Sequence, residues 1–133
     1  MIIIDTSVLV AILGDEPGAG RYTELISEDP EPRVSAATFA EAGIVLSARY
    51  GAAGLHYLQL FLAKAEVEII PLDAGQAEIA VRAYRDFGKA NHPAGLNYGD
   101  CFSYALARTS DAPLLFKGTD FSQTDITAAI KDS

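Results

Sequence analysis

The stretch Ile2-Ile3-Ile4-Asp5 decides the fold, because three consecutive β-branched residues run directly into a carboxylate. A short and fully apolar run of this kind is typical of a strand that is buried on both faces. Strands of that kind belong to parallel sheets that helices cover on both sides. We therefore expect Asp5 at the carboxyl end of a buried strand, which is where ligands bind in such sheets.

Outward from this strand, the chain alternates between strand-like and helical segments. Further short strands are predicted at residues 33–35, 67–70 and 114–116. Helices are predicted at residues 6–13, 17–27, 36–50, 54–64, 73–88 and 97–109, and the tail from Asp120 is expected to hold one short strand and a last helical turn. Because right-handed crossovers join strands that helices separate, the predicted fold class is α/β, with three layers and a short parallel sheet of four to five strands flanked by helices.

Length and composition favour a single domain that spans residues 1–133, since half of the residues are hydrophobic and can form one core. The lone Cys101 excludes a disulfide framework and favours a reducing compartment. No apolar stretch reaches the roughly 20 residues of a membrane span, and the start of the chain lacks the basic segment of a signal peptide. The sequence therefore predicts a cytoplasmic protein that does not enter a membrane.

Four acidic residues fall where the predicted sheet would bring carboxylates together. Asp5 follows the first strand, Asp120 follows the strand at 114–116, and Asp100 lies in the first turn of a helix. Glu41 lies in a helix of small and apolar residues, so its side chain is expected to point inward. Converging carboxylates repel one another and need protons or cations, and hard oxygen ligands suit Mg²⁺ or Mn²⁺. Such a site can activate water for phosphoryl displacement.

Each of these acids also has a structural interpretation. Asp5 would serve as a turn residue or helix N-cap, and the segment Thr38-Phe39-Ala40-Glu41 fits a capping box. Asn97 would cap the helix whose dipole Asp100 complements, and Asp120 would be a turn acid after Gly118. The functional interpretation gains weight because Asp5 and Asp120 independently fall at strand carboxyl ends.

The same residues lie in an ordered set of motifs that resembles the PIN-domain ribonucleases, and more narrowly the VapC toxins of bacterial type II toxin–antitoxin systems. The resemblance spans the whole chain, and its matching pieces are Ile3-Ile4-Asp5-Thr6-Ser7, Ser35-Ala36-Ala37-Thr38, Glu41-Ala42-Gly43, Gly88-Lys89, His92-Pro93-Ala94, Leu96-Asn97-Tyr98-Gly99-Asp100-Cys101, Leu114-Leu115-Phe116-Lys117-Gly118, Asp120-Phe121 and Thr124-Asp125-Ile126. It implies a metal-dependent endoribonuclease that leaves 5′-phosphate and 3′-hydroxyl ends. One or two Mg²⁺ or Mn²⁺ ions would be held by Asp5, Glu41, Asp100 and Asp120.

The resemblance also implies a second group of residues around these four acids. Thr6 or Ser7 matches a small hydroxyl residue that contacts a carboxylate or the phosphate. Asp125 matches a position where many members carry an acid. We place Lys117 and Thr119 in the same group, because they lie within three residues of Asp120 in the sequence.

The charge of the chain conflicts with an RNA substrate. Ten basic residues against eighteen acidic ones give a net charge of −8, which repels nucleic acid unless cations or a local basic face intervene. Arg82, Arg85 and Lys89 recur on one helix face that leads toward His92, so these four residues are candidate RNA contacts. The structural alternatives are a solvated helix face and a loop histidine with a structural rather than a catalytic role.

The first half of the chain holds more apolar surface than a small domain is expected to bury, notably in the segments 36–50 and 55–62. The resemblance implies two interfaces, one for a homodimer and one for a cognate VapB-like antitoxin. An antitoxin arm would insert an arginine among the carboxylates and so block the metal or the substrate.

Two other classes of protein share parts of this pattern. A receiver-like phosphoacceptor domain also combines an acidic pocket with a lysine after a late strand, but it needs paired acids after the first strand, where this chain has Asp5-Thr6-Ser7. A catalytically inactive PIN-like binding module would keep the fold and lose the acids, whereas all four acids are present here. Dependence on Mg²⁺ separates a nuclease from a binding module.

Overall fold

The structure is a computed structural model that describes residues 1–130. The elements follow in the order β1 (Ile2–Ile4), α1 (Thr6–Leu13), α2 (Ala19–Glu28), β2 (Pro32–Ser35), α3 (Ala36–Tyr50), α4 (Ala52–Lys64), β3 (Glu68–Ile70), α5 (Ala74–Phe87), α6 (Asp100–Ser110), β4 (Leu114–Leu115) and a turn of 3₁₀ helix, η1 (Asp120–Gln123).

The four strands form one parallel sheet in the order β3-β2-β1-β4. In the central strand β1, Ile3 pairs with Arg33 of β2 on one side and with Leu114 of β4 on the other. The free edge of β4 is met by the tail, where Ala128 forms a single parallel bridge to Leu114. The predicted α/β class with a short parallel sheet is confirmed.

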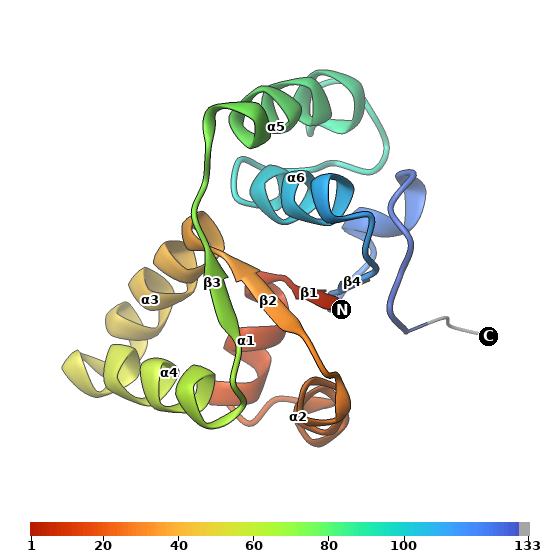
Figure 1. Cartoon of the computed structure of the whole chain (residues 1–133). Helices are drawn as coiled ribbons and strands as arrows, with labels where there is room; N and C mark the ends of the chain where they lie inside the picture. The colour runs from red at the N-terminus through yellow and green to blue at the C-terminus, as the bar shows by residue number, and fades with distance from the viewer. Residues whose placement is uncertain (131–133) are drawn as a thin grey trace.

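Helices cover both faces of the sheet, as Figure 1 shows, with α3 and α4 on one side and α5 and α6 on the other. The three isoleucines of β1 explain this arrangement, because successive side chains of a strand point to opposite faces. Ile2 and Ile4 pack in the core with α1, α3 and α4, whereas Ile3 packs in a second core with α5 and α6. The strand is therefore buried on both faces, as its sequence predicts.

The observed bounds differ from the predicted ones in ways that local geometry explains. The helix expected at 17–27 begins at Ala19, because Gly18 adopts a φ of 94° that no helix continues. The helix expected at 97–109 begins at Asp100, after a turn that Asn97 and Asp100 close with reciprocal hydrogen bonds. The tail holds its helical turn at η1, ahead of the bridge at Ala128, and residues 131–133 lie outside the described part of the chain.

No helix among the described residues is long and apolar enough to cross a membrane.

Candidate functional site

Asp5 is 3% exposed and directly follows β1, where both of its carboxylate oxygens are held by neighbours. Oδ2 accepts hydrogen bonds from the Ser7 amide at 3.1 Å and from the Ser7 hydroxyl at 2.6 Å, and Oδ1 accepts one from the Ser103 hydroxyl at 2.6 Å. The first of these bonds is an N-cap of α1. Asp5 therefore fills the structural role that the sequence allowed and also presents an oriented carboxylate at the carboxyl edge of the sheet.

Ser7 links this carboxylate to the loop after β4. Its hydroxyl accepts a hydrogen bond from the Lys117 backbone amide at 2.9 Å while it donates to Asp5. The loop then turns at Gly118, whose φ is 102°, and reaches Asp120 in the first turn of η1. The hydrogen bond from Lys117 to Ser7 thus fixes the start of the segment that carries Asp120.

Glu41 does not form a capping box. The N-cap of α3 is Ser35, whose hydroxyl accepts a hydrogen bond from the Ala37 amide at 3.2 Å, so the capping-box interpretation of residues 38–41 is wrong. Thr6 instead donates its hydroxyl to Glu41 Oε1 at 2.6 Å, across the gap between α1 and α3. The inward direction expected for the Glu41 side chain is the one observed.

Asp100 begins α6 and is tied to the turn before it. Its amide donates to Asn97 Oδ1 at 2.9 Å, and the Asn97 amide donates back to Asp100 Oδ2 at 3.0 Å. Burial raises the pKa of Asp100 to about 7; the Asn97 hydrogen bond opposes the rise, and the charges of Asp5 and Asp120 add to it.

The four predicted acids are therefore neighbours. Asp5 and Asp120 both act electrostatically on Asp100, and Glu41 lies against Gly99, where its carboxylate fills the space that a Cβ atom would need. None of the ion pairs in residues 1–130 includes any of the four. Within the same residues, no three acidic, histidine or cysteine side chains are grouped tightly enough to form a ready-made metal site.

Other predicted residues lie apart from this group. The Lys117 ammonium donates to Glu16 Oε1 at 2.8 Å, so only its backbone amide faces the Asp5 side. Thr119 is exposed, and its carbonyl accepts the Ser122 hydroxyl at 2.6 Å. Asp125 accepts the Tyr104 hydroxyl at 2.7 Å and lies 3.3 Å from Arg108, contacts that join the tail to α6.

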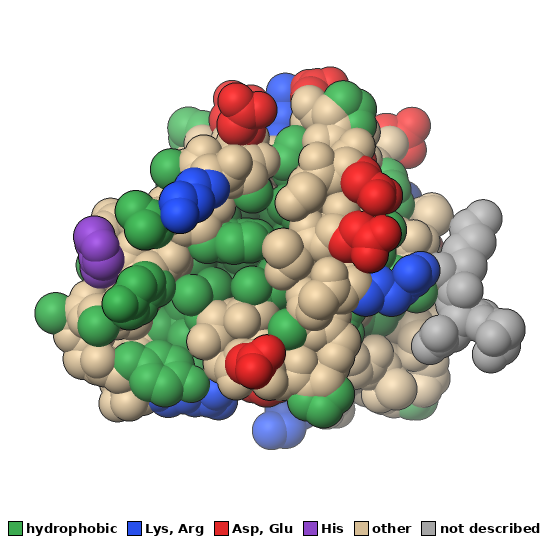
Figure 2. Space-filling model, turned by 90° about the horizontal axis from the view of Figure 1, so that it is seen from below, with side chains coloured by type: hydrophobic (Ala, Val, Ile, Leu, Met, Phe, Trp, Pro, Cys, Tyr) green, Lys and Arg blue, Asp and Glu red, His purple; other side chains and the backbone are tan. Residues whose placement is uncertain are grey.

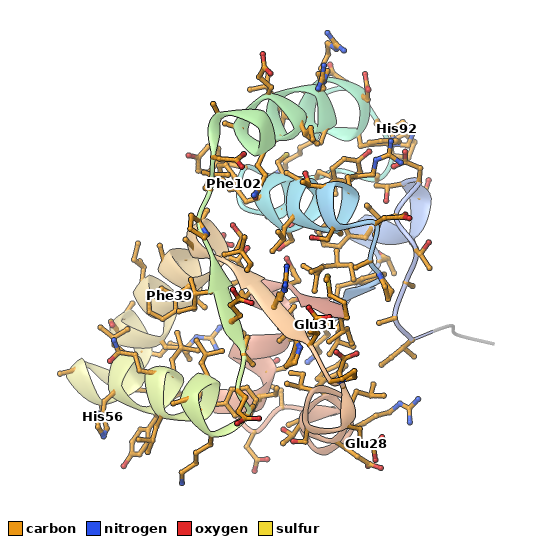
Figure 3. The ribbon with its side chains drawn as sticks, in the orientation of Figure 1. Glu28, Glu31, Phe39, His56, His92 and Phe102 are labelled. Carbon is orange, nitrogen blue, oxygen red and sulfur yellow. The ribbon has the colours of Figure 1, made fainter. Side chains whose placement is uncertain are left out.

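The four candidate RNA contacts differ in their surroundings. Arg82, Arg85 and Lys89 are exposed, but Arg82 borders a hollow with Asp125, while Lys89 borders a different hollow with Asn97 and Tyr98. His92 Nδ1 accepts the Ala94 amide at 3.0 Å, and its ring packs edge-on against Phe87. Figure 3 shows His92 at the opposite end of the α5–α6 pair from Phe102, which lies in the first turn of α6.

The sequence did not predict that Ser103 and Thr38 belong to this site. Ser103 and Thr38 are completely or almost completely buried, with 0% and 1% exposure, and their hydroxyls lie 3.1 Å apart. Ser103 is three residues after Asp100 and so lies on the same helix face. A small polar residue at that spacing, inside the apolar run 101–107, was the available signal.

Two further hollows among the described residues are mainly apolar. One of about 560 Å³ is lined by residues of α1, α3 and α4, among them Tyr50, Tyr57 and Leu60, and Figure 2 shows hydrophobic side chains around a hollow on this face, close to the only visible histidine. Another of about 360 Å³ adjoins Glu41 and includes Ile44, Leu72 and Tyr98. The apolar surface that the sequence predicts is therefore exposed in part, although Leu58 and Leu62 are buried.

A family model described as the PIN domain matches residues 2–126 of the chain. Among curated proteins, the Ribonuclease VapC of Mycolicibacterium smegmatis is 51% identical over 126 residues, which cover 95% of this chain and 98% of that protein.

Two solved structures share the fold. Mycobacterium tuberculosis VapC20, a sarcin-ricin loop cleaving toxin, superposes with a TM-score of 0.78 at 18% identity, over 96% of this chain and 97% of that one. VapBC2 from Rickettsia felis, bound to a DNA fragment from its promoter, gives a TM-score of 0.74 at 18% identity, over 96% of both chains. At these identities the similarity shows the fold alone.

Proposed function

Because this chain belongs to the PIN-domain family, and within it to the VapC ribonucleases, we propose that it is a metal-dependent endoribonuclease and the toxin of a type II toxin–antitoxin system. Its substrate is RNA, and the reaction is hydrolysis of a phosphodiester bond. The proposed catalytic residues and metal ligands are Asp5, Glu41, Asp100 and Asp120.

The observation that carries this proposal is the concentration of uncompensated negative charge at the carboxyl edge of the sheet. Asp5 is buried, Asp100 is partly buried, and Asp120 is close enough to raise the pKa of Asp100. Lys117 is the lysine nearest to Asp120 in the sequence, and its ammonium donates to Glu16 rather than to these carboxylates. Carboxylates that are held together without a basic partner favour a bound cation.

The donor set fits a hard divalent cation, since all four side chains offer oxygen. Mg²⁺ commonly binds through one or two carboxylates and completes its shell with water and substrate phosphate, so one or two Mg²⁺ or Mn²⁺ ions do not require a closed protein cage. When bound, such a cation would activate water and neutralise charge on the phosphate.

The protein's own residues have separate parts in this proposal. Asp5 enters the site with its orientation fixed by Ser7 and Ser103. Thr6 holds Glu41, and Asn97 holds Asp100, through hydrogen bonds of 2.6 and 3.0 Å. Preorganised carboxylates of this kind lower the cost of arranging charge around the reacting phosphate.

We propose that RNA is captured by weak, local contacts, because the protein as a whole carries a net charge of −8. Arg82, Arg85 and Lys89 remain the candidate cationic contacts, and His92 supports the loop beside Lys89. Thr119 and Lys117 remain candidates for contacts around the site, whereas Asp125 is a candidate only for a supporting role from the tail. Single-stranded or looped RNA suits a shallow and weakly cationic surface.

The proposed protein partners are a cognate VapB-like antitoxin and a second copy of this chain. The two apolar hollows offer surfaces for these interfaces, since exposed apolar patches on small domains mark protein contacts. An antitoxin arm that carries an arginine would neutralise the carboxylates; this idea fails if an arm without its basic residue inhibits equally well. We further propose that residues 1–133 act as one domain in the cytoplasm.

The deciding experiment compares wild type with Asp5→Ala on total cellular RNA, with Mg²⁺ and with EDTA. Discrete fragments that carry 5′-phosphates, produced only by wild type with metal, are the expected result. If both proteins leave RNA intact at high concentration with Mn²⁺, the proposal is wrong, and the inactive binding module becomes the better interpretation.

A further inference from the structure

A chain of two buried hydroxyls ends on the Asp5 carboxylate. Ser103 Oγ lies 2.6 Å from Asp5 Oδ1, and Thr38 Oγ1 lies 3.1 Å from Ser103 Oγ. All three side chains are at least 97% buried. They come from three different elements of the fold, since Thr38 is on α3, Ser103 is on α6 and Asp5 follows β1.

The direction of these hydrogen bonds follows from the number of protons available. An ionised carboxylate only accepts hydrogen bonds, so the single hydroxyl proton of Ser103 is donated to Asp5. Ser103 must then accept in its contact with Thr38, and Thr38 is the donor. The hydrogen bonds therefore run from Thr38 to Ser103 to Asp5.

The hydrogen bond from Ser103 fixes Asp5 Oδ1, the carboxylate oxygen that Ser7 leaves free. Ser7 occupies Oδ2 with two hydrogen bonds, whereas Ser103 alone occupies Oδ1. Two donors on opposite oxygens prevent the carboxylate from rotating about its Cβ–Cγ bond. The remaining acceptor direction on Oδ1 therefore has a defined orientation.

We propose that Ser103, supported by Thr38, is a positioning residue that sets the orientation of Asp5 for binding of a divalent cation. The inference rests on the proposed function, because it assigns Asp5 to the cation. Neither hydroxyl touches substrate or metal in this proposal. Outer partners of metal ligands commonly control affinity in this way.

Thr38 provides a matched pair of variants. Thr38→Val keeps the branched shape and removes the hydroxyl, whereas Thr38→Ser keeps the hydroxyl and removes one methyl group. Ser103→Ala removes the direct donor and introduces a residue that is favourable in helices. Urea unfolding in EDTA shows which variants are folded, and calorimetric titration of the full chain with MnCl₂ gives the dissociation constant.

We expect Ser103→Ala to weaken Mn²⁺ binding by about 10- to 100-fold, in line with other outer partners of metal ligands. Thr38→Val should weaken it less than Ser103→Ala, and Thr38→Ser should bind as wild type does. Wild-type affinity in folded Ser103→Ala overturns the inference, and so does equal weakening in both Thr38 variants, which would indicate packing. If wild type binds no Mn²⁺, the proposed function itself is wrong and the inference falls with it.

Discussion

The main chain at Gly99 lies directly against the carboxylate of Glu41, so a Cβ atom at position 99 would occupy space that the carboxylate fills. Gly99 is buried and immediately precedes Asp100, whereas Glu41 lies on α3. The start of α6 and the acidic side chain of α3 therefore meet through a residue without a side chain. This contact places Glu41 beside the residue that precedes Asp100.

Gly99→Ala should consequently damage cleavage more than stability. The added methyl group displaces the Glu41 carboxylate, which is the end of a flexible side chain, so the main cost is the hydrogen bond from Thr6, about 1 kcal/mol. Gly20→Ala is the matched control, since no atom lies within 4 Å of a Cβ at that helical position. The control should gain about 0.5–1 kcal/mol, because alanine favours helices over glycine.

Urea unfolding and RNA cleavage are measured for both glycine variants. Unchanged cleavage in Gly99→Ala would show that Glu41 does not need its observed position.

Asp100→Asn should abolish cleavage and yet stabilise the metal-free protein. Burial and the charges of Asp5 and Asp120 disfavour the ionised form of Asp100, so a neutral amide relieves the repulsion. We expect a gain of about 1 kcal/mol in EDTA, which is well below the full shift because water screens this partly exposed group. Chemical unfolding in EDTA measures it, and a loss of stability would mean that the carboxylates do not repel.

Asp120 and Asp125 should differ in their roles. Asp120 is close to Asp100, whereas Asp125 is bound by Tyr104 and Arg108. Asp120→Asn should reduce the rate of cleavage by about 10- to 100-fold, the usual cost of disturbing a metal site. Tyr104→Phe removes the hydrogen bond to Asp125, so it should cost about 1 kcal/mol of unfolding free energy and leave cleavage unchanged. Loss of cleavage in Asp125→Asn or Tyr104→Phe would contradict this division.

Glu16 should contribute to stability in a pH-dependent way. The hydrogen bond from Lys117 holds the pKa of Glu16 below its ordinary value of 4.5. The contribution is therefore present above the unfolded-state pKa and is lost as the pH falls through the lower folded-state pKa. Glu16→Gln should destabilise the protein at pH 7, and its difference from wild type should vanish in acid, as followed by urea unfolding across pH. Glu24→Gln, an exposed change on α2, is the control, and a pH-independent difference would contradict the mechanism.

The cations of α5 and the following loop should be visible in the salt dependence of RNA binding. If Arg82, Arg85 and Lys89 contact phosphates, replacing each by alanine should reduce the slope of log affinity against log salt by about 0.7 per contact. Lys64→Ala is the control, because α4 lies on the other side of the sheet from α5 (Figure 1). Equal slopes for all variants would place the RNA elsewhere.

The sequence by itself determined the order and class of the elements. Ile2-Ile3-Ile4 predicts a strand buried on both faces, and such a strand requires helices on both sides, which the structure confirms. It also determined that Asp5 follows this strand and that Asp120 follows β4, because position at a strand end depends only on local pattern. The resemblance to the PIN-domain VapC proteins, carried by the same motifs, is confirmed as well.

The tertiary structure alone decided which side chains meet. Thr38 and Ser103 are 65 residues apart, and Ser103 and Asp5 are 98 residues apart, so no local pattern relates them. The sequence predicted that Thr38 caps its own helix. In the structure, its hydroxyl instead forms a hydrogen bond with Ser103 of α6. Hydrogen bonds need donor and acceptor to lie about 3 Å apart, and only the packing of α3 and α6 against the shared sheet sets distances that small.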